Sequence, residues 1–216
     1  MKIETKNTIS GRLFDLIKLN NKFHKYESIK INNKSLIISP VEAKVKYIGK
    51  IDNNGIIISK NNKKINIKEL IGEYSKYFKG GSYINFYLKP NNKHFWVTPA
   101  SGKFIYTQKN QGNSKIPVLI GLENLLGIEM FSKAVKKNAS ISSIFQTKNN
   151  LIAMIAVGSL NVNRIHVNYK QGINYKKGHP CGYFSLGSSM LLCFQKNKNF
   201  LVNEGDAVKI GEKILW

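Results

Sequence analysis

Short apolar runs separated by polar turns dominate the chain from residue 35 onwards. Most of these runs alternate between apolar and polar residues or are rich in β-branched residues, and both patterns indicate β-strands. The predicted strands lie at residues 36–38, 44–48, 55–58, 65–67, 83–88, 103–106, 140–146, 151–157 and 164–169. The run at 151–157 is apolar throughout, which predicts a strand buried on both faces. The pattern therefore predicts an α+β fold that is mainly β.

Helical spacing of apolar residues appears twice. Between residues 9 and 19, Leu13, Leu16 and Ile17 share one helical face, and Ser10 is available as the N-cap. The apolar face of this helix packs either on its own domain, which we favour, or on a membrane surface. A second short helix is expected at residues 68–77. We expect one domain over residues 1–216, with residues 1–34 as a helical N-terminal segment.

Glycines recur between short apolar positions near the C-terminal end of the chain. Residues 203–214 carry Gly205-Asp206 and Gly211 between short apolar positions, which predicts a tight-turned hairpin. The pattern resembles the hairpin of biotinyl and lipoyl domains, but no lysine stands at the tip that those carriers modify. We therefore expect a structural hairpin that completes the fold.

The charge balance narrows the choice of partners. Among the 216 residues, 34 Lys and Arg face 12 Asp and Glu, which gives a formal net charge of +22. Only Arg12 and Arg164 are arginines, whereas base-edge and bidentate phosphate recognition favour arginine. Sequence-specific binding to nucleic acid is therefore not expected. An anionic phospholipid surface as partner and a merely solvated lysine-rich surface explain the charge equally well, while general polyanion binding rests on charge alone.

The sequence predicts neither a membrane-spanning segment nor a metal site. The chain opens without a signal peptide, and no apolar run reaches the ~18 residues that span a bilayer. Cys181 and Cys193 lie in or beside apolar segments and match neither a metal-ligand spacing nor a disulfide framework. We expect reduced core cysteines and a cytoplasmic protein whose contact with membranes is peripheral.

Four sequence blocks, in order, resemble those of the phosphatidylserine decarboxylase family. Residues 39–43, SPVEA, stand where the family has SP(A/V)DG, and residues 87–102, YLKPNNKHFWVTPASG, match YLxPxDYHRxHxPxxG. Residues 157–165, VGSLNVNRI, match VGAxxVGxI, and residues 177–189, KGHPCGYFSLGSS, match KGxExGxFxxGST. A Gly-Ser-Ser tripeptide alone is typical of a turn before a buried strand. Four blocks in register instead support a relationship to this family.

The resemblance implies a self-processing enzyme. In the family, the hydroxyl of the cleavage-site serine attacks the preceding glycine carbonyl, and the serine becomes a pyruvoyl group at a new N-terminus. The serine here is Ser188 and the acyl donor is Gly187, and glycine suits that position because no side chain obstructs the attack. The pyruvoyl group derived from Ser188 is the electron sink for decarboxylation, so no exogenous cofactor is expected.

The resemblance fails at positions that carry chemistry. The Asp that orients the base in the family is Glu42 here, and the second His of YHRxH, which is that base, is Val97. Glutamate can orient an imidazole, but valine cannot accept a proton. The first His is kept as His94, to which the family assigns decarboxylation or protonation of the product carbanion. His166 and His179 lie near the cleavage segment. Each is either a substitute base or an ordinary surface imidazole, and we favour the second interpretation.

Two functions therefore compete. The first is a pyruvoyl-dependent decarboxylase that converts phosphatidylserine to phosphatidylethanolamine, with Ser188, Gly187, His94 and Glu42 as its site residues. The second is an uncleaved, catalytically silent relative of the same fold that binds anionic phospholipid or a partner protein. The sequence leaves open the oligomeric state and the choice of amine substrate.

Overall fold

Antiparallel strands make up most of the described chain, so the predicted α+β fold that is mainly β is confirmed. The computed structural model describes residues 2–4, 30–32, 34, 36–59, 62–89, 91–113, 116, 129–159, 164–184 and 188–215. Gly187 and the helix expected at residues 9–19 lie outside these residues. Residues 2–4 of the expected helical N-terminal segment form a strand instead, because they pair with residues 164–166.

The largest sheet has eight strands, and each is antiparallel to its neighbours. Its strands, in spatial order, are β12 (Asn174–Tyr175), β8 (Gly102–Asn110), β9 (Ser140–Gln146), β10 (Leu151–Gly158), β14 (Ser188–Phe194), β6 (Ser82–Leu88), β3 (Ala43–Lys50) and β15 (Ala207–Val208). The two apolar runs, β10 and β14, lie side by side at its centre. This position explains why their sequences are apolar on both faces.

Three smaller sheets complete the strand set of the described residues. The second sheet has the order β1 (Lys2–Glu4), β11 (Arg164–Val167), β13 (Pro180–Phe184) and β7 (Phe95–Val97). The other two are the pairs β2 (Ile37–Ile38) with β16 (Lys213–Leu215), and β4 (Ile56–Ile58) with β5 (Lys64–Asn66).

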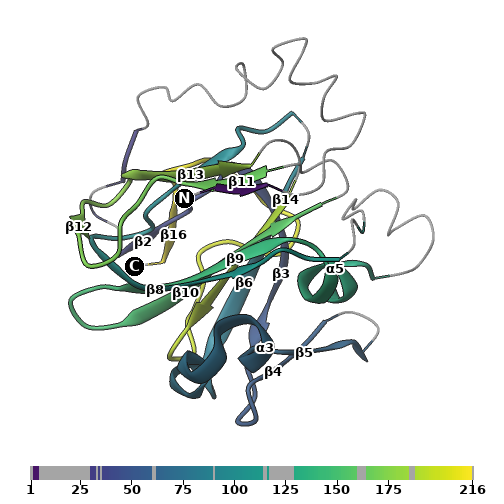
Figure 1. The fold of residues 1–216 in the computed structure, drawn as a ribbon. Helices are drawn as coiled ribbons and strands as arrows, with labels where there is room; N and C mark the ends of the chain where they lie inside the picture. Colours follow the sequence, from purple (N-terminus) through teal and green to yellow (C-terminus); the bar gives the residue numbers. More distant parts are fainter. Residues whose placement is uncertain are drawn as a thin grey trace.

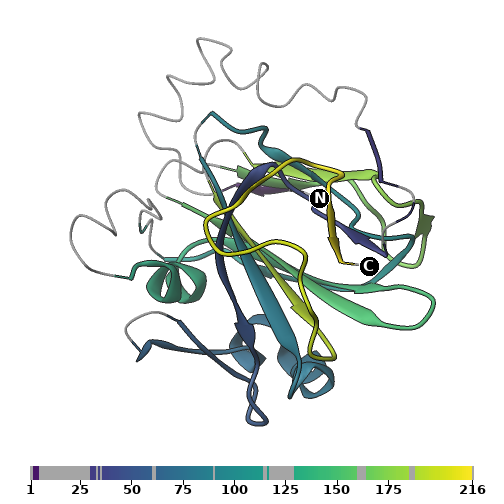
Figure 2. The same cartoon turned by 180° about the vertical axis from the view of Figure 1, so that it is seen from behind.

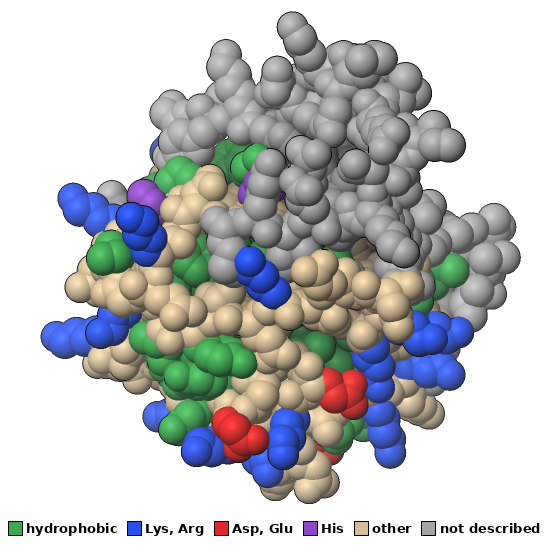
Figure 3. Space-filling view, in the orientation of Figure 1, with side chains coloured by type: hydrophobic (Ala, Val, Ile, Leu, Met, Phe, Trp, Pro, Cys, Tyr) green, Lys and Arg blue, Asp and Glu red, His purple; other side chains and the backbone are tan. Residues whose placement is uncertain are grey.

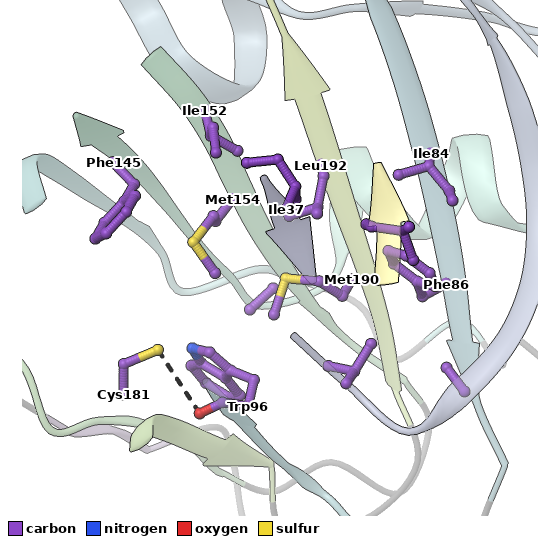
Figure 4. Close-up of a cluster of buried hydrophobic side chains, with 14 of the residues drawn as sticks. Ile37, Ile84, Phe86, Trp96, Phe145, Ile152, Met154, Cys181, Met190 and Leu192 are labelled. Atoms are coloured by element: carbon purple, nitrogen blue, oxygen red, sulfur yellow. Dashed lines mark hydrogen bonds between the residues drawn. The ribbon is translucent and has the colours of Figure 1, made fainter. Parts of the chain in front are cut away.

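The second sheet covers one face of the large sheet (Figures 1 and 2). Alternate residues of the central strands, such as Phe86, Met190 and Leu192, are buried in one cluster with Trp96 and Phe184 of the second sheet. Figure 4 shows Met190 and Leu192 projecting from their strand into this cluster, with Trp96 beneath them. The main core therefore lies between the two sheets.

Helical segments cover the opposite face of the large sheet (Figure 1). The predicted helix at 68–77 is confirmed as α3 (Lys68–Ile71), which runs into the 3₁₀ helix η2 (Gly72–Phe78). A further helix, α5 (Phe131–Lys137), was not predicted. Leu70 and Phe131 from these segments share a second buried cluster with Leu191 and Cys193 of β14. Strand β14 is thus enclosed on both faces.

The predicted closing hairpin is wrong in its pairing. A tight turn is present, since the Glu212 N–H donates to the Lys209 carbonyl at 3.1 Å and Gly211 has a φ of 86°. The two strands that it joins nevertheless bond to different partners, because β15 pairs with β3 and β16 pairs with β2. A local sequence rhythm specifies the turn, whereas the partners are set by sheet edges distant in sequence.

Candidate functional site

Ser188 is the first residue of β14 and lies between two neighbouring strands. It is opposite Leu88 of β6 on one side and Gly158 of β10 on the other. Its side chain is fully buried, and its Oγ has no hydrogen-bond partner among the described residues. A buried hydroxyl without a partner is costly, so this position holds a polar group that packing alone does not explain.

The side chain of Ser188 faces the second sheet. Successive residues of a strand point to opposite faces, and Met190 and Leu192 on β14 lie in the core between the two sheets. Ser188 shares their face by this alternation. Ser189 shares the opposite face with Leu191, on the side of α5, and its Oγ also has no partner in the described part of the chain. The two adjacent serines are therefore chemically alike but point in opposite directions.

His94 lies at the end of the second sheet nearest to Ser188. Its carbonyl accepts the Phe184 N–H at 2.7 Å, and Phe184 ends β13, four residues before Ser188. The His94 side chain is fully buried. Trp96, two residues on, packs its ring at 4.7 Å from that of Phe184 in the core between the sheets. His94 precedes β7, and its bond to Phe184 continues the antiparallel pairing by one residue, so strand alternation extended to it places His94 on the same face, toward the large sheet.

Glu42 lies just before β3, in the same row of the large sheet as Ser188. The pairing of Lys44 with Tyr87, continued by one residue, sets Ala43 opposite Leu88, which is itself opposite Ser188. Two strand spacings of ~4.8 Å put Ala43 roughly 10 Å from Ser188. The structure thus brings Glu42, which precedes Ala43, into the neighbourhood of the serine.

The Glu42 carboxylate is held by an amide. Its Oε1 accepts a hydrogen bond from Asn92 Nδ2 at 3.0 Å, and Asn92 Oδ1 accepts the Lys89 N–H at 2.8 Å. Asn92 stands where the family pattern YLxPxDYHRxHxPxxG has its Asp, and the sequence did not predict its contact with Glu42. The signal was present, because Asn92 and Glu42 both differ from the family pattern, and an amide beside a carboxylate avoids the repulsion of two acids.

Glu42 and Asn92 also line a surface groove of about 730 Å³. Three lysines and a second acid share its lining, namely Lys30, Lys93, Lys209 and Glu212. Lysine and arginine are spread over the described surface in the view of Figure 3, where acidic side chains are few. The lysines of the groove thus outnumber its two acids, Glu42 and Glu212, by one, which leaves a small excess of positive charge there.

Val97 lies in an apolar cluster. It is fully buried with Ile38, Phe95 and Ile210, in a cluster separate from the core between the sheets. Its N–H donates to the Pro40 carbonyl at 3.0 Å, so its backbone lies close to the segment that carries Glu42. The position is near the acid, but the side chain contributes packing and no proton acceptor.

The two other described histidines do not share the face of Ser188. His166 pairs with Tyr183 and stacks on its ring at 4.1 Å, while its neighbours Ile165 and Val167 point into the core between the sheets. His179 is exposed beside Tyr175, at the opposite end of the second sheet from His94. Neither is placed as a substitute base, so His94 is the described imidazole that faces Ser188.

The cysteines behave as the sequence predicts. Cys181 and Cys193 are buried and unbridged. Burial raises the pKa of the Cys181 thiol well above its ordinary value, which keeps the sulfur protonated.

Among the described residues there is no group of three or more His, Cys, Asp or Glu that could hold a metal ion. The same residues include no helix long and apolar enough to cross a membrane.

Comparison with known proteins decides the family. The sequence model described as Phosphatidylserine decarboxylase matches residues 18–215. The chain belongs to the phosphatidylserine decarboxylase family. The phosphatidylserine decarboxylase proenzyme of Halalkalibacterium halodurans is 31% identical over 182 residues, which cover 82% of this chain and 67% of that protein.

Two further relatives carry the same name. The proenzyme of a Geobacillus species is 32% identical over 186 residues, covering 84% of this chain and 69% of that protein. The Bacillus subtilis proenzyme is 30% identical over 185 residues, covering 82% and 66%. Gly187, Ser188, His94 and Glu42 all lie within the residues that the family model matches.

Proposed function

We propose that this chain is a pyruvoyl-dependent decarboxylase that converts phosphatidylserine to phosphatidylethanolamine after self-cleavage between Gly187 and Ser188. One observation carries the proposal. Ser188 begins a central strand of the large sheet with a buried hydroxyl that has no partner in the described part of the chain, on the face toward His94. Family membership supplies the reaction to which this arrangement is suited.

Self-cleavage would use groups of the chain and one water. The Ser188 hydroxyl gives up its proton and attacks the Gly187 carbonyl, so a C–O ester bond forms while the peptide C–N bond breaks. Loss of the Cα proton of residue 188 then expels the ester oxygen, which becomes part of a carboxylate on Gly187. The unsaturated residue left at 188 takes up one water and releases one ammonia. His94 is the described imidazole suited to accept the hydroxyl proton.

The position of Ser188 fits a pyruvoyl group. The pyruvoyl group is no larger than the serine from which it derives. The buried Ser188 Oγ has no hydrogen-bond partner among the described residues, so its loss leaves none of them unsatisfied. A pyruvoyl carbonyl at residue 188 supplies the electrophile that holds the substrate amine and takes up the electron pair left by carbon dioxide. His94 is then suited to return a proton to the carbon that has lost its carboxylate.

Anionic phospholipid is the proposed partner surface. The net charge of +22 favours an anionic bilayer, at about 1 kcal/mol for each lysine held near the headgroups. Lys30, Lys93 and Lys209 line the groove beside Glu42, which supports the approach of a phosphate group to this side of the molecule. We propose a cytoplasmic protein that binds the membrane peripherally.

Product analysis tests the proposed activity. Purified protein is incubated with phosphatidylserine vesicles, and phosphatidylethanolamine and carbon dioxide are measured. The proposal expects both products in equal amounts, and none with Ser188→Ala. A protein that has cleaved itself but forms neither product would exclude phosphatidylserine as the substrate.

A catalytically silent relative is the second candidate. Val97 in its apolar cluster and the Glu42–Asn92 hydrogen bond favour it, because neither group is arranged to activate a base. This candidate expects an uncleaved chain that still binds anionic vesicles. Self-cleavage of the purified protein would exclude it.

A further inference from the structure

A second concave site lies at the end of the large sheet opposite to Ser188. It is a cavity of about 250 Å³, and Ile37, Ala100, Ile152 and Phe194 contribute its apolar wall. Ile152 is at the start of β10 and Phe194 at the end of β14. We call this cavity the distal pocket.

The distal pocket is separate from the candidate active site. Six residue steps along β14 divide Phe194 from Ser188, which is roughly 20 Å in a strand. Met190 and Leu192 lie between them on the same face and are almost fully buried in the core. Packed side chains therefore fill the space between the two sites.

Lysines surround the opening of the distal pocket. Lys148, Lys177 and Lys198 line it, and none of the lining residues is acidic. The Lys177 ammonium donates to the Asn32 carbonyl at 2.8 Å, and burial lowers the pKa of Lys177 from its ordinary value. An anion placed beside this ammonium would offset the cost of that burial.

Hydrogen bonds hold the walls of the distal pocket in place. Gln195 Oε1 accepts the Leu151 N–H at 2.7 Å, which ties the ends of β14 and β10 together. The Lys177 N–H donates to Ser101 Oγ at 3.1 Å, which fixes the segment that carries the ammonium. The strand ends that form the wall and the segment that carries Lys177 are thus held together by hydrogen bonds.

We propose that the distal pocket binds a single-chain anionic amphiphile, that is, one apolar chain with a carboxylate or phosphate head. Its volume is just below the ~300–1,000 Å³ of typical ligand pockets, which suits one short chain rather than two. The apolar wall would enclose the chain, and Lys177 and Lys198 would bind the head. Leu36, with 54% of its surface exposed, extends the apolar wall outward.

Calorimetric titration tests this proposal. Decanoate and decyl phosphate are the probes, used as monomers, with decanol as the uncharged control. We expect saturable binding to one site for both anions and at least tenfold weaker binding of decanol. A second arm presents a single-chain anionic lipid, lysophosphatidic acid, in phosphatidylcholine vesicles, since the same chemistry can occur in a bilayer.

Charge variants assign any binding to this pocket. Lys177→Gln and Lys198→Gln are each expected to weaken binding at least tenfold, and Lys198→Gln does so without removing the Lys177 bond to Asn32. Lys133→Gln is the matched control, because this exposed lysine lies on α5, over the other face of the sheet.

The possible results distinguish the two sources of ligand from each other and from failure of the proposal. Monomer binding that depends on Lys198 supports a soluble ligand, and vesicle binding alone with the same dependence supports a bilayer lipid. No saturable binding in either arm, or binding that Lys177→Gln and Lys198→Gln leave unchanged, would overturn the proposal. None of these results depends on whether the chain cleaves itself or decarboxylates a lipid.

Discussion

Positions 94 and 97, where the family pattern has its two histidines, lie three residues apart and have different surroundings in this chain. His94, the residue before β7, is fully buried, and the alternation of β7 extended by one residue turns it toward the core. Val97 is equally buried, but in the separate cluster with Ile38, Phe95 and Ile210. Burial is the same at both positions, so burial alone does not explain which residue is polar.

The contrast separates packing from chemistry. Burying an imidazole costs free energy that an apolar side chain avoids, and at position 97 the chain has the apolar residue. At position 94 the chain has the imidazole although burying it costs the same free energy. This difference supports a chemical use for His94 and a structural use for Val97.

Ser188→Ala is expected to have the largest effect, because it removes the hydroxyl that we propose attacks the Gly187 carbonyl. We expect complete loss of cleavage products on a denaturing gel, with little change in stability, since Oγ has no partner among the described residues. Ser189→Ala is the matched control. It removes a buried, unpartnered hydroxyl from the opposite face of the same strand and should leave cleavage intact. If Ser189→Ala abolished cleavage and Ser188→Ala did not, the attacking hydroxyl would belong to Ser189 and not to Ser188.

His94→Ala is expected to slow cleavage by about 10²–10⁴-fold, the usual contribution of a general base. The rate is measured by quenching samples of freshly folded protein over time. His166→Ala is the control and should change the rate by less than about twofold, because a surface imidazole away from the reacting groups contributes no proton transfer. A large effect of His166→Ala together with no effect of His94→Ala would contradict the assignment of His94 as the general base.

Val97→His tests the structural half of the comparison. Placing an imidazole among Ile38, Phe95 and Ile210 is expected to lower the free energy of unfolding by about 1–3 kcal/mol, measured by urea denaturation. Val97→Ile keeps the cluster apolar and measures the cost of added volume alone, about 1–3 kcal/mol for an extra methylene in a packed core, so the histidine variant should be the less stable of the two. If the histidine variant is as stable as the wild type, packing is not the reason that the imidazole is absent.

Glu42→Gln is expected to have the smallest effect. The amide oxygen of glutamine can still accept the hydrogen bond from Asn92 Nδ2, which is the contact seen for the Glu42 side chain in the described part of the chain. We expect the cleavage rate to fall by less than about tenfold, since the lost charge acts on Ser188 only through space. A loss as large as that of His94→Ala would show that the Glu42 carboxylate acts directly in maturation.

Much of the fold was predictable because the signals are local. The apolar run at 151–157 became the central strand β10, and residues 68–77 became α3 and η2. Helix α5 was not predicted although Phe131, Ala134 and Val135 show helical spacing and are buried, because seven residues are too few for the spacing to stand out. The pairing of β15 and β16 with separate sheets depends on distant partners that no local pattern specifies.

The candidate site was predictable in its residue types but not in its geometry. The motifs identified Ser188, His94 and Glu42, whereas the strand alternation that turns His94 toward Ser188 and Val97 away from the core requires the pairing of β7 with β13. The contact between Glu42 and Asn92 joins residues 50 positions apart. Such contacts follow from sheet topology and not from spacing along the chain.

Intact-mass spectrometry of the purified wild-type protein tests the central claim most directly. The account predicts two products, residues 1–187 and residues 188–216, with the smaller one lighter by one ammonia than the peptide that begins with serine. Ser188→Ala should give a single species of about 24.5 kDa. A wild-type chain that stays a single species after prolonged incubation would contradict the account.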